Sequence, residues 1–323
     1  MVSRTDILDP IQEEFDLFEQ RYASLFHCSD AAVDMLLKFL LRRRGKFVRP
    51  ILVLLTAKCF GEINEKTYNL ASALELMHQG SLIHDDVVDE SCERRGHRSV
   101  NAAYDNRVAV LLGDFIVSKA LQEMSKTDNR SCIDAIFSLI GTLSEGELTQ
   151  LDTLNHSQLS EDLYFQIITK KTAILFATCT SLAAVLNGAS DSEIEAFRTY
   201  GLLAGQCFQI KDDILDYMDS SITGKPQGND LQQGKFTLPA IYALQHSDRD
   251  WSGHIKAIRS MEATPQQILE VADFSVSNGG ISYAESKMES LRRQAVESLP
   301  AGIPPRLHQA LENYLEMIVS RQK

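Results

Sequence analysis

The chain has 323 residues, of which 44% are hydrophobic and 24% are charged, the composition of a folded globular protein. Its formal net charge of -12 at pH 7 argues against nucleic acid as a partner, because phosphate backbones are bound by basic surfaces. The six cysteines include no CxxC pair, so neither a zinc site nor a disulfide framework is expected.

The N-terminal region, residues 1–15, lacks the basic stretch and apolar core of a secretory signal. Continuous apolar runs such as Ile51–Leu55 are far shorter than the roughly 20 residues that cross a bilayer. We therefore expect a cytoplasmic protein. Because no repeat, low-complexity tract or Pro/Gly/Ser-rich linker divides the chain, residues 1–323 are expected to form one domain.

Residues typical of helix ends recur along the chain. Asp9-Pro10 and Thr264-Pro265 each have the pattern of an N-cap followed by proline in the first turn. Pro50 can open a helix whose apolar residues continue to Phe60, with Gly61 as the C-cap. These signals predict a chain divided into many helices.

Helical periodicity fills the segments between these ends. Between Glu65 and Glu90, apolar residues recur at steps of three to five residues, which is typical of one helix face. Similar patterns occupy Val108–Met124, Ile133–Leu154, Leu163–Leu186, Ile194–Met218 and His308–Ile318. No long period-two alternation indicates a sheet. The sequence therefore predicts an all-α protein, a single large helical bundle.

Two of these helical segments carry the pattern DDxxD. The six aspartates are Asp85, Asp86 and Asp89 in the first segment and Asp212, Asp213 and Asp216 in the second. Positions i, i+1 and i+4 of a helix fall within an arc of about 100°, so the three carboxylates share one face. Their mutual repulsion in apolar surroundings would raise their pKa values. Magnesium would relieve it, because Mg²⁺ prefers oxygen ligands and commonly bridges carboxylates to phosphates.

The alternative for each motif is a solvated acidic helix face. Apolar residues speak against it, because Val87 and Val88 interrupt the first motif, and Phe208, Ile210 and Ile214 surround or interrupt the second. Two acidic motifs in core-like helices indicate a pair of metal-binding faces. We expect them to hold a group of magnesium ions around one diphosphate.

Basic residues complete this anion site. They are Lys46 and Arg49 before Pro50, Arg94 and Arg95 after the first motif, Lys170 and Lys171 inside an apolar segment, and Lys225 and Lys235 in the glycine-rich stretch 223–234 and just after it. Arginine binds phosphate oxygens with two donors, whereas lysine acts as a mobile point charge. Each residue alone is more often a surface residue, but their occurrence beside the two acidic motifs indicates a phosphorylated substrate.

Five segments in order resemble the motif series of the trans-isoprenyl diphosphate synthases, of the medium- or long-chain polyprenyl type. They are GKFVRP at 45–50, HDDVVDESCERRG at 84–96, KKTAILF at 170–176, GQCFQIKDDILD at 205–216 and GKPQGNDLQQGKFTLP at 224–239. Order and spacing agree over about residues 40–240. Two positions depart from the family pattern: Arg44 replaces a usual second glycine, and Phe47 stands where a polar residue is frequent.

The resemblance implies an isoprenoid-synthase bundle with a central active-site cavity, a homodimer, and three magnesium ions per site. The implied metal ligands are Asp85, Asp86, Asp89, Asp212 and Asp216, with Asp213 as a ligand or a support. The allylic diphosphate would be held by Arg94, Lys171, Lys225 and Lys235, and isopentenyl diphosphate by Lys46, Arg49, His78 and Arg95. Thr172 and Gln209 would steady the allylic cation, so the residues expected to take part in catalysis are Asp85, Asp86, Asp212, Lys171, Thr172 and Gln209.

Product length is expected to depend on the helix that carries Asp85. Ser81 and Gly80, four and five residues earlier, are small, and Met77 behind them is flexible. One helical turn is about 5.4 Å long, close to one isoprene unit. We therefore expect a product of C30–C45, octaprenyl-like. The floor of the cavity is expected at Phe115 or Ile116.

Other interpretations remain open from the sequence. Gly80 and Ser81 can simply permit close helix packing, and the product can be as short as farnesyl or geranylgeranyl diphosphate. A class I terpene cyclase normally has only one DDxxD and no second diphosphate pocket, and a non-catalytic synthase subunit tends to lose aspartates. A long product also predicts transient membrane contact during its release.

Overall fold

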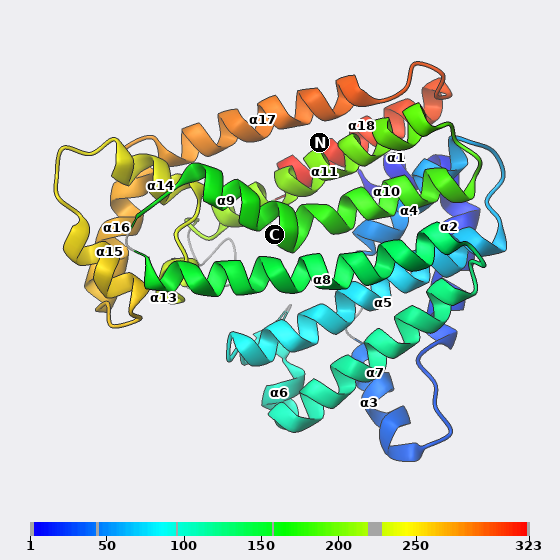
Figure 1. Cartoon of the computed structure of the whole chain (residues 1–323), viewed down its shortest axis with the longest axis horizontal. Helices are drawn as coiled ribbons and strands as arrows, with labels where there is room; N and C mark the ends of the chain where they lie inside the picture. Colours follow the sequence, from blue (N-terminus) through cyan, green and yellow to red (C-terminus); the bar gives the residue numbers. More distant parts are fainter. Residues whose placement is uncertain (1–2, 43–44, 95, 157, 219–227, 322–323) are drawn as a thin grey trace.

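The computed structural model describes residues 3–42, 45–94, 96–156, 158–218 and 228–321. The chain forms a bundle of long helices, with α14, α15 and α16 gathered at one end (Figure 1). The elements of the first half are α1 Arg4–Leu8, the 3₁₀ turn η1 Asp9–Ile11, α2 Gln12–Ser24, α3 Ala31–Leu41, α4 Val48–Lys58, α5 Glu65–Val88, β1 Glu93–Arg94, β2 His97–Arg98, α6 Val100–Ala103, α7 Asn106–Ser125 and α8 Arg130–Asp152.

The second half continues the bundle. Its elements are the 3₁₀ turn η2 Thr153–Asn155, α9 Glu161–Ile168, the π-helical turn η3 Thr169–Ala173, α10 Ile174–Leu186, α11 Asp191–Leu215, α13 Asn229–Gln232, α14 Leu238–Gln245, α15 Ser252–Arg259, α16 Pro265–Ser277, α17 Gly280–Ser298 and α18 Pro305–Ser320. The prediction of an all-α fold is confirmed. The short antiparallel pair β1–β2 forms a hairpin just after the first aspartate motif.

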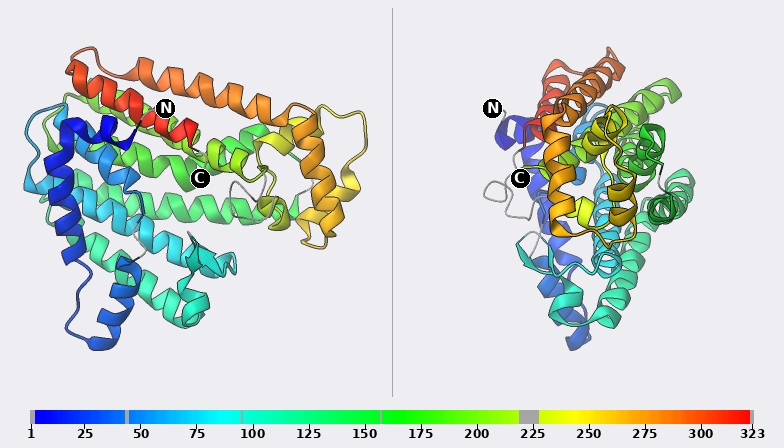
Figure 2. Two further views of the ribbon diagram at one scale, coloured as in Figure 1. Left: turned by 180° about the vertical axis from the view of Figure 1, so that it is seen from behind. Right: turned by 90° about the vertical axis from the view of Figure 1, so that its left-hand side faces the viewer.

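The core is centred on α4 and α5. Every residue from Arg49 to Ala57 in α4 is buried, which is expected of a helix surrounded by others on all sides. The middle of α5, from Leu70 to Met77, is buried as well. Helix α5 packs along α7, and α11 packs between α10 and α17, as the two further views also show (Figure 2). The two aspartate motifs thus lie at the ends of two long, firmly packed helices.

One predicted helix end is confirmed and one is wrong. Thr264 caps α16 through a capping box with Gln267, and Pro265 occupies the first turn. Asp9 makes no such cap, because α1 already begins after Ser3 and Asp9 has helical dihedrals. Its carboxylate instead accepts a hydrogen bond of 2.8 Å from Arg306 in α18. Asp9 therefore ties the N-terminus to the last helix.

The segment predicted as one helix, Leu163–Leu186, contains the π-helical turn η3. Such turns add a residue to the helix and are frequent at functional sites, and this one holds Lys171 and Thr172. In the described part of the chain, the continuous stretch Glu161–Leu186 is the one helix long and apolar enough to cross a membrane. However, 67% of its apolar window is buried in the bundle, as in the core helix of a globular fold.

Close packing at Gly205 sets the distance between α11 and η3. A β-carbon at Gly205 would lie 2.5 Å from the Cα atom of Ala173, a backbone atom that cannot turn away. Gly205 lies four residues before Gln209, and Ala173 follows Thr172, so this contact brings two predicted site residues together.

We expect Gly205→Val to lower the free energy of unfolding by about 1–3 kcal/mol, because the added methyl groups must push the helices apart. Urea denaturation measures this change. Gly253→Val in α15 is the matched control, since a β-carbon there meets no atom within 4 Å. Equal stabilities of the two variants would contradict the packing argument.

Candidate active site

Arg94 neutralises a buried carboxylate of the first motif. Asp86 is only 4% exposed, and its Oδ1 accepts hydrogen bonds of 2.9 Å and 2.5 Å from Nε and Nη2 of Arg94. The hairpin after α5 turns the chain back so that Arg94 reaches the motif eight residues before it. A buried charge needs such a partner to offset its lost hydration. The expected proximity of Arg94 to the first motif is therefore present in the structure.

Asp85 and Lys171 face each other across the site. Burial raises the pKa of Asp85 to about 6, with the negative charge of Glu147 adding to the rise and the positive charge of Lys171 opposing it. Burial lowers the pKa of Lys171, but Glu147 and Asp85 outweigh that effect and leave it raised. The Lys171 ammonium lies 2.6 Å from Glu147 and donates to Gln150 over 3.1 Å. A bound cation would therefore favour the charged form of Asp85.

Lys235 connects the glycine-rich region to the first motif. Its Nζ donates to both carboxylate oxygens of Asp89, over 3.1 Å and 3.2 Å, and to Gln233 over 2.6 Å. The lysine and the aspartate are separated by 146 positions in sequence. The structure therefore brings Lys235 to the site, as expected of a residue that closes over it.

The second motif has a cationic partner that the sequence analysis missed. Arg321, beyond the end of α18, lies 2.9 Å from the Asp212 carboxylate. Its guanidinium stacks 3.9 Å from the centre of the Phe208 ring and donates to the Phe208 carbonyl over 2.7 Å. No pattern around Arg321 in the sequence marked it, because only the return of α18 along α11 brings the C-terminal end to the site.

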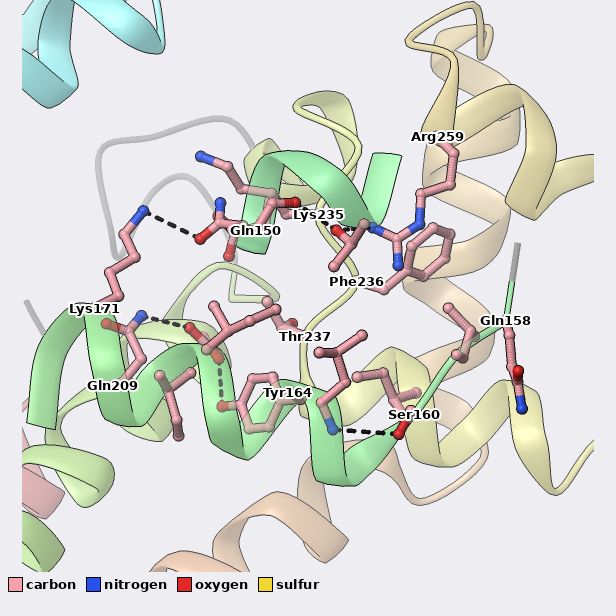
Figure 3. A pocket seen from close by; sticks show the side chains of 18 residues that line it. Gln150, Gln158, Ser160, Tyr164, Lys171, Gln209, Lys235, Phe236, Thr237 and Arg259 are labelled. Carbon is pink, nitrogen blue, oxygen red and sulfur yellow. Dashed lines mark hydrogen bonds between the residues drawn. The ribbon is translucent and has the colours of Figure 1, made fainter. Parts of the chain in front are cut away.

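Asp213 is held by two hydrogen bonds from neighbouring helices. Tyr164 donates its hydroxyl to one oxygen over 2.6 Å, and Gln209 donates its amide to the other over 2.8 Å (Figure 3). Thr172 in turn donates to the Gln209 carbonyl over 2.7 Å. Burial raises the pKa of Asp213, and the charges of Asp212 and Asp216 add to the rise.

Both oxygens of Asp213 accept hydrogen bonds from side chains of the protein, which fits the supporting role that the sequence analysis allowed beside metal ligation. Helical spacing indicates that Asp213 lies on the acidic face, but it does not reveal the partner on α9. Asp216 is half-buried and accepts a hydrogen bond of 3.0 Å from the backbone N–H of Asp230.

Two cavities adjoin the motifs. The first, of about 120 Å³, is lined by Lys171, Gln209, Asp213 and Lys235 together with residues of α9, α14 and α15 (Figure 3). The second, of about 60 Å³, is lined by His78, Asp86, Arg94 and Gly45 among others. The second cavity therefore adjoins the first motif and includes His78, one of the residues that the resemblance assigns to isopentenyl diphosphate.

Arg49 is buried at the start of α4, whereas Lys46 is exposed. The Arg49 guanidinium is 4.9 Å from the ring centre of Phe176 and 5.9 Å from that of Phe208. Phe47, the departure from the family pattern, begins α4 in a left-handed conformation with φ of 52°. Its ring packs edge-on against the buried rings of Phe18 and Tyr22. Phe47 therefore anchors the turn between the two cations.

Three positions singled out in the sequence lie outside the described residues. They are Lys225 and Arg95, expected to bind the two diphosphates, and the departure at Arg44. They remain sequence predictions.

The chain-length positions are arranged as in close helix packing. A β-carbon at Gly80 would lie 2.8 Å from Cγ2 of Val117 and 3.4 Å from the Gly113 carbonyl, both on α7. Ser81 is half-buried and donates to the His78 carbonyl, and Met77 is 3% exposed. The element that faces Gly80 is therefore α7, with Val117 as the contacting side chain, and the floor expected at Phe115 or Ile116 of the same helix stays a prediction.

The carboxylates fit divalent metals in chemistry but are not preassembled. Among the described residues, no three His, Cys, Asp or Glu side chains are gathered in a group that could hold an ion. Instead Arg94, Lys235 and Arg321 each neutralise one motif carboxylate. Side chains of these two kinds suit a divalent metal bound together with a phosphate group, because carboxylates bind the metal and the cations bind phosphate oxygens.

The sequence profile of the polyprenyl synthetase family matches residues 30–273, three quarters of the chain. The chain belongs to this family. It is 34% identical over 98% of both chains to an all-trans-nonaprenyl-diphosphate synthase (geranyl-diphosphate specific) from Rhodobacter capsulatus. It is also 32% identical over 79% of both chains to an octaprenyl diphosphate synthase from Escherichia coli.

Solved structures agree with this family. A polyprenyl synthase from Caulobacter crescentus, complexed with calcium and isoprenyl diphosphate, matches with a TM-score of 0.92 at 29% identity over 99% of this chain and 98% of the other. A geranylgeranyl pyrophosphate synthase from Bacteroides thetaiotaomicron matches with a TM-score of 0.86 at 38% identity over 98% and 99%. The protein is a trans-prenyltransferase, a class that uses a divalent metal ion to join isopentenyl diphosphate to an allylic diphosphate.

We expect Tyr164→Phe to weaken the second motif, because it removes one of the two donors to a buried carboxylate. The loss is expected to cost about 1–3 kcal/mol of stability and to lower turnover. Tyr283→Phe is the matched control, since that hydroxyl also donates to a carboxylate, Glu161, but away from the two motifs. Steady-state kinetics and denaturation of both variants test this, and normal turnover of Tyr164→Phe would contradict it.

Proposed function

We propose that this prenyltransferase is a magnesium-dependent polyprenyl diphosphate synthase that extends an allylic diphosphate to a product of C30–C45. The observation that carries the proposal is the pairing of the two aspartate motifs with Arg94, Lys235 and Arg321. A site in which carboxylates and phosphate-binding cations alternate is suited to a diphosphate bound with metal ions. Nonaprenyl and octaprenyl synthases among its relatives support the length.

The cations around the two aspartate motifs serve the ionisation of the allylic diphosphate. Negative charge grows on the diphosphate as the allylic C–O bond breaks, and Arg94, Lys171 and Lys235 are placed to stabilise it. The two motifs would hold magnesium, whose chemistry when bound is Lewis-acid stabilisation of that leaving group. Three ions are proposed per site, as the family resemblance implies.

Formation of the new carbon–carbon bond needs isopentenyl diphosphate bound beside the allylic cation. The double bond of isopentenyl diphosphate attacks the allylic cation, a new C–C bond forms, and a proton leaves to the departed diphosphate. Thr172 and Gln209, joined by their hydrogen bond, direct oxygen dipoles that steady the cation. Arg49 and His78 bind the second diphosphate. This second anion region favours a synthase over a cyclase, which would release a hydrocarbon.

We expect Asp85→Ala to lower kcat about 10²-fold or more, because a carboxylate proposed to hold magnesium at the leaving diphosphate is lost. Purified protein, magnesium, an allylic diphosphate and labelled isopentenyl diphosphate provide the assay. Asp134→Ala, an exposed aspartate paired with Arg130 on α8, is the control and should leave turnover unchanged. Near-normal turnover of Asp85→Ala would sink the proposed mechanism, and a hydrocarbon product would favour the cyclase.

Product length is tested at Gly80. If this position limits the growing chain, Gly80→Phe shortens the product by one or more isoprene units while the protein stays folded. If Gly80 serves only the contact with Val117, the same variant loses stability and the remaining activity gives products of the original length. Chromatography of the dephosphorylated products and thermal melting of Gly80→Phe and Gly80→Ala distinguish the two outcomes.

We also propose a homodimer. Several large apolar side chains on α7 and α8 are exposed, namely Val110, Leu111, Phe137, Leu148 and Leu151. Exposed apolar groups gathered on two neighbouring helices are typical of a surface covered by a partner. Phe137→Glu combined with Leu148→Glu should lower the mass measured by analytical ultracentrifugation from that of two chains to one. An unchanged mass would reject this surface as the interface.

Product release is proposed to occur at a membrane surface, with the enzyme otherwise in the cytoplasm. A C30–C45 chain is too apolar to leave readily into water. Lipid vesicles should therefore raise steady-state turnover without changing the rate of a single condensation. A turnover rate that vesicles leave unchanged would reject membrane-assisted release.

A further inference from the structure

Arg259, the last residue of α15, is a buried cation outside every motif considered above. It is 9% exposed, and no carboxylate of the described residues lies within the 4.0 Å distance of an ion pair. Burial lowers the pKa of its guanidinium to about 10. A charge buried without an acidic partner costs free energy. The contacts that Arg259 makes instead indicate why the arginine is buried there.

Those contacts hold both neighbours of Lys235. Nη1 of Arg259 donates to the Gly234 carbonyl over 3.0 Å, and the guanidinium lies 5.0 Å from the centre of the Phe236 ring. The same Nη1 donates to Thr153 over 2.8 Å, at the end of the helix that carries Gln150. Figure 3 shows Arg259 beside Phe236, with its guanidinium pointing into the larger cavity.

The backbone of this segment has little room to move. Gly234 has a left-handed φ of 74°, and a β-carbon there would lie 2.6 Å from Leu154 and 3.2 Å from the Ile258 carbonyl. The backbone just before Lys235 is therefore packed closely between η2 and the end of α15. From this position the Lys235 ammonium lies 3.1 Å from the Asp89 carboxylate.

We propose that Arg259 is a positioning residue for Lys235. Its planar guanidinium fixes the carbonyl before the lysine and the ring after it, and ties both to the end of α8. The reach of Lys235 to the first motif and to the leaving diphosphate is then set by an arginine that touches neither. This inference rests on the role proposed above for Lys235.

A double-mutant cycle tests it, with Lys235→Met, Arg259→Ala and the combined variant. Arg259→Ala should lower kcat/KM for the allylic diphosphate about tenfold, as expected when a catalytic group is displaced, and leave KM for isopentenyl diphosphate within about twofold. In the Lys235→Met background, the same substitution should change kcat/KM by less than about twofold. Thermal melting is measured for each protein, and Arg259→Gln replaces the alanine variant if that does not fold.

The control is Arg249→Ala, an exposed arginine paired with Glu270 just before α15, which should leave the kinetics unchanged. A tenfold loss from Arg259→Ala that persists in the Lys235→Met background would overturn the inference, as would a loss that falls equally on both substrates. If Lys235→Met alone has no effect, the role of Lys235 fails and this inference fails with it. If Lys235→Met is impaired but Arg259→Ala is not, only this inference fails.

Discussion

The neutralisation of clustered carboxylates governs the architecture of this site. Six aspartates stand at the ends of two packed helices, where burial raises the pKa of Asp85 to about 6 and also raises that of Asp213. Such charges are tolerated only when opposite charges or hydrogen-bond donors compensate for the lost water. Apart from Arg94, the structure supplies these partners from distant parts of the chain, so the site is complete only when the bundle is packed.

The cations that balance the aspartates are also the groups suited to bind a diphosphate. Arg94, Lys235 and Arg321 each hold one motif carboxylate, and each pair is partly enclosed, with Arg94 and Asp212 as its more exposed members and Asp86 buried. Removing the partner of such an enclosed carboxylate is costly, so an exchange of cations needs a metal ion to take the place of the departing arginine or lysine. The site is therefore suited to binding metal ions and diphosphate together.

Much of this arrangement could be predicted from the sequence. The helical period placed the first motif at the end of α5, and the all-α bundle follows from the same patterns. Local contacts were also accessible, since Arg94 lies only eight residues from Asp86. What escaped prediction were contacts between distant segments. Arg321 reaches Asp212 only because α18 returns along α11, and Tyr164 reaches Asp213 only because α9 lies beside it.

Asp213 shows the physical reason for this limit. A helical pattern gives the direction of a side chain around its own axis, but the partner on the facing helix decides whether a carboxylate is free or engaged. The same holds for Gly80, whose small size indicated a cavity in the sequence and lies against α7 in the structure. The contacts of Arg259 with Gly234 and Phe236, on either side of Lys235, likewise follow from tertiary packing alone.

The central claim is that metal ions and diphosphate replace the internal cations together. Isothermal titration calorimetry with inorganic diphosphate, magnesium, and both tests it directly. The account predicts that saturating magnesium tightens diphosphate binding at least about tenfold, and that diphosphate tightens magnesium binding by the same factor, as reciprocal coupling requires. Diphosphate binding of equal affinity with and without magnesium would contradict the account.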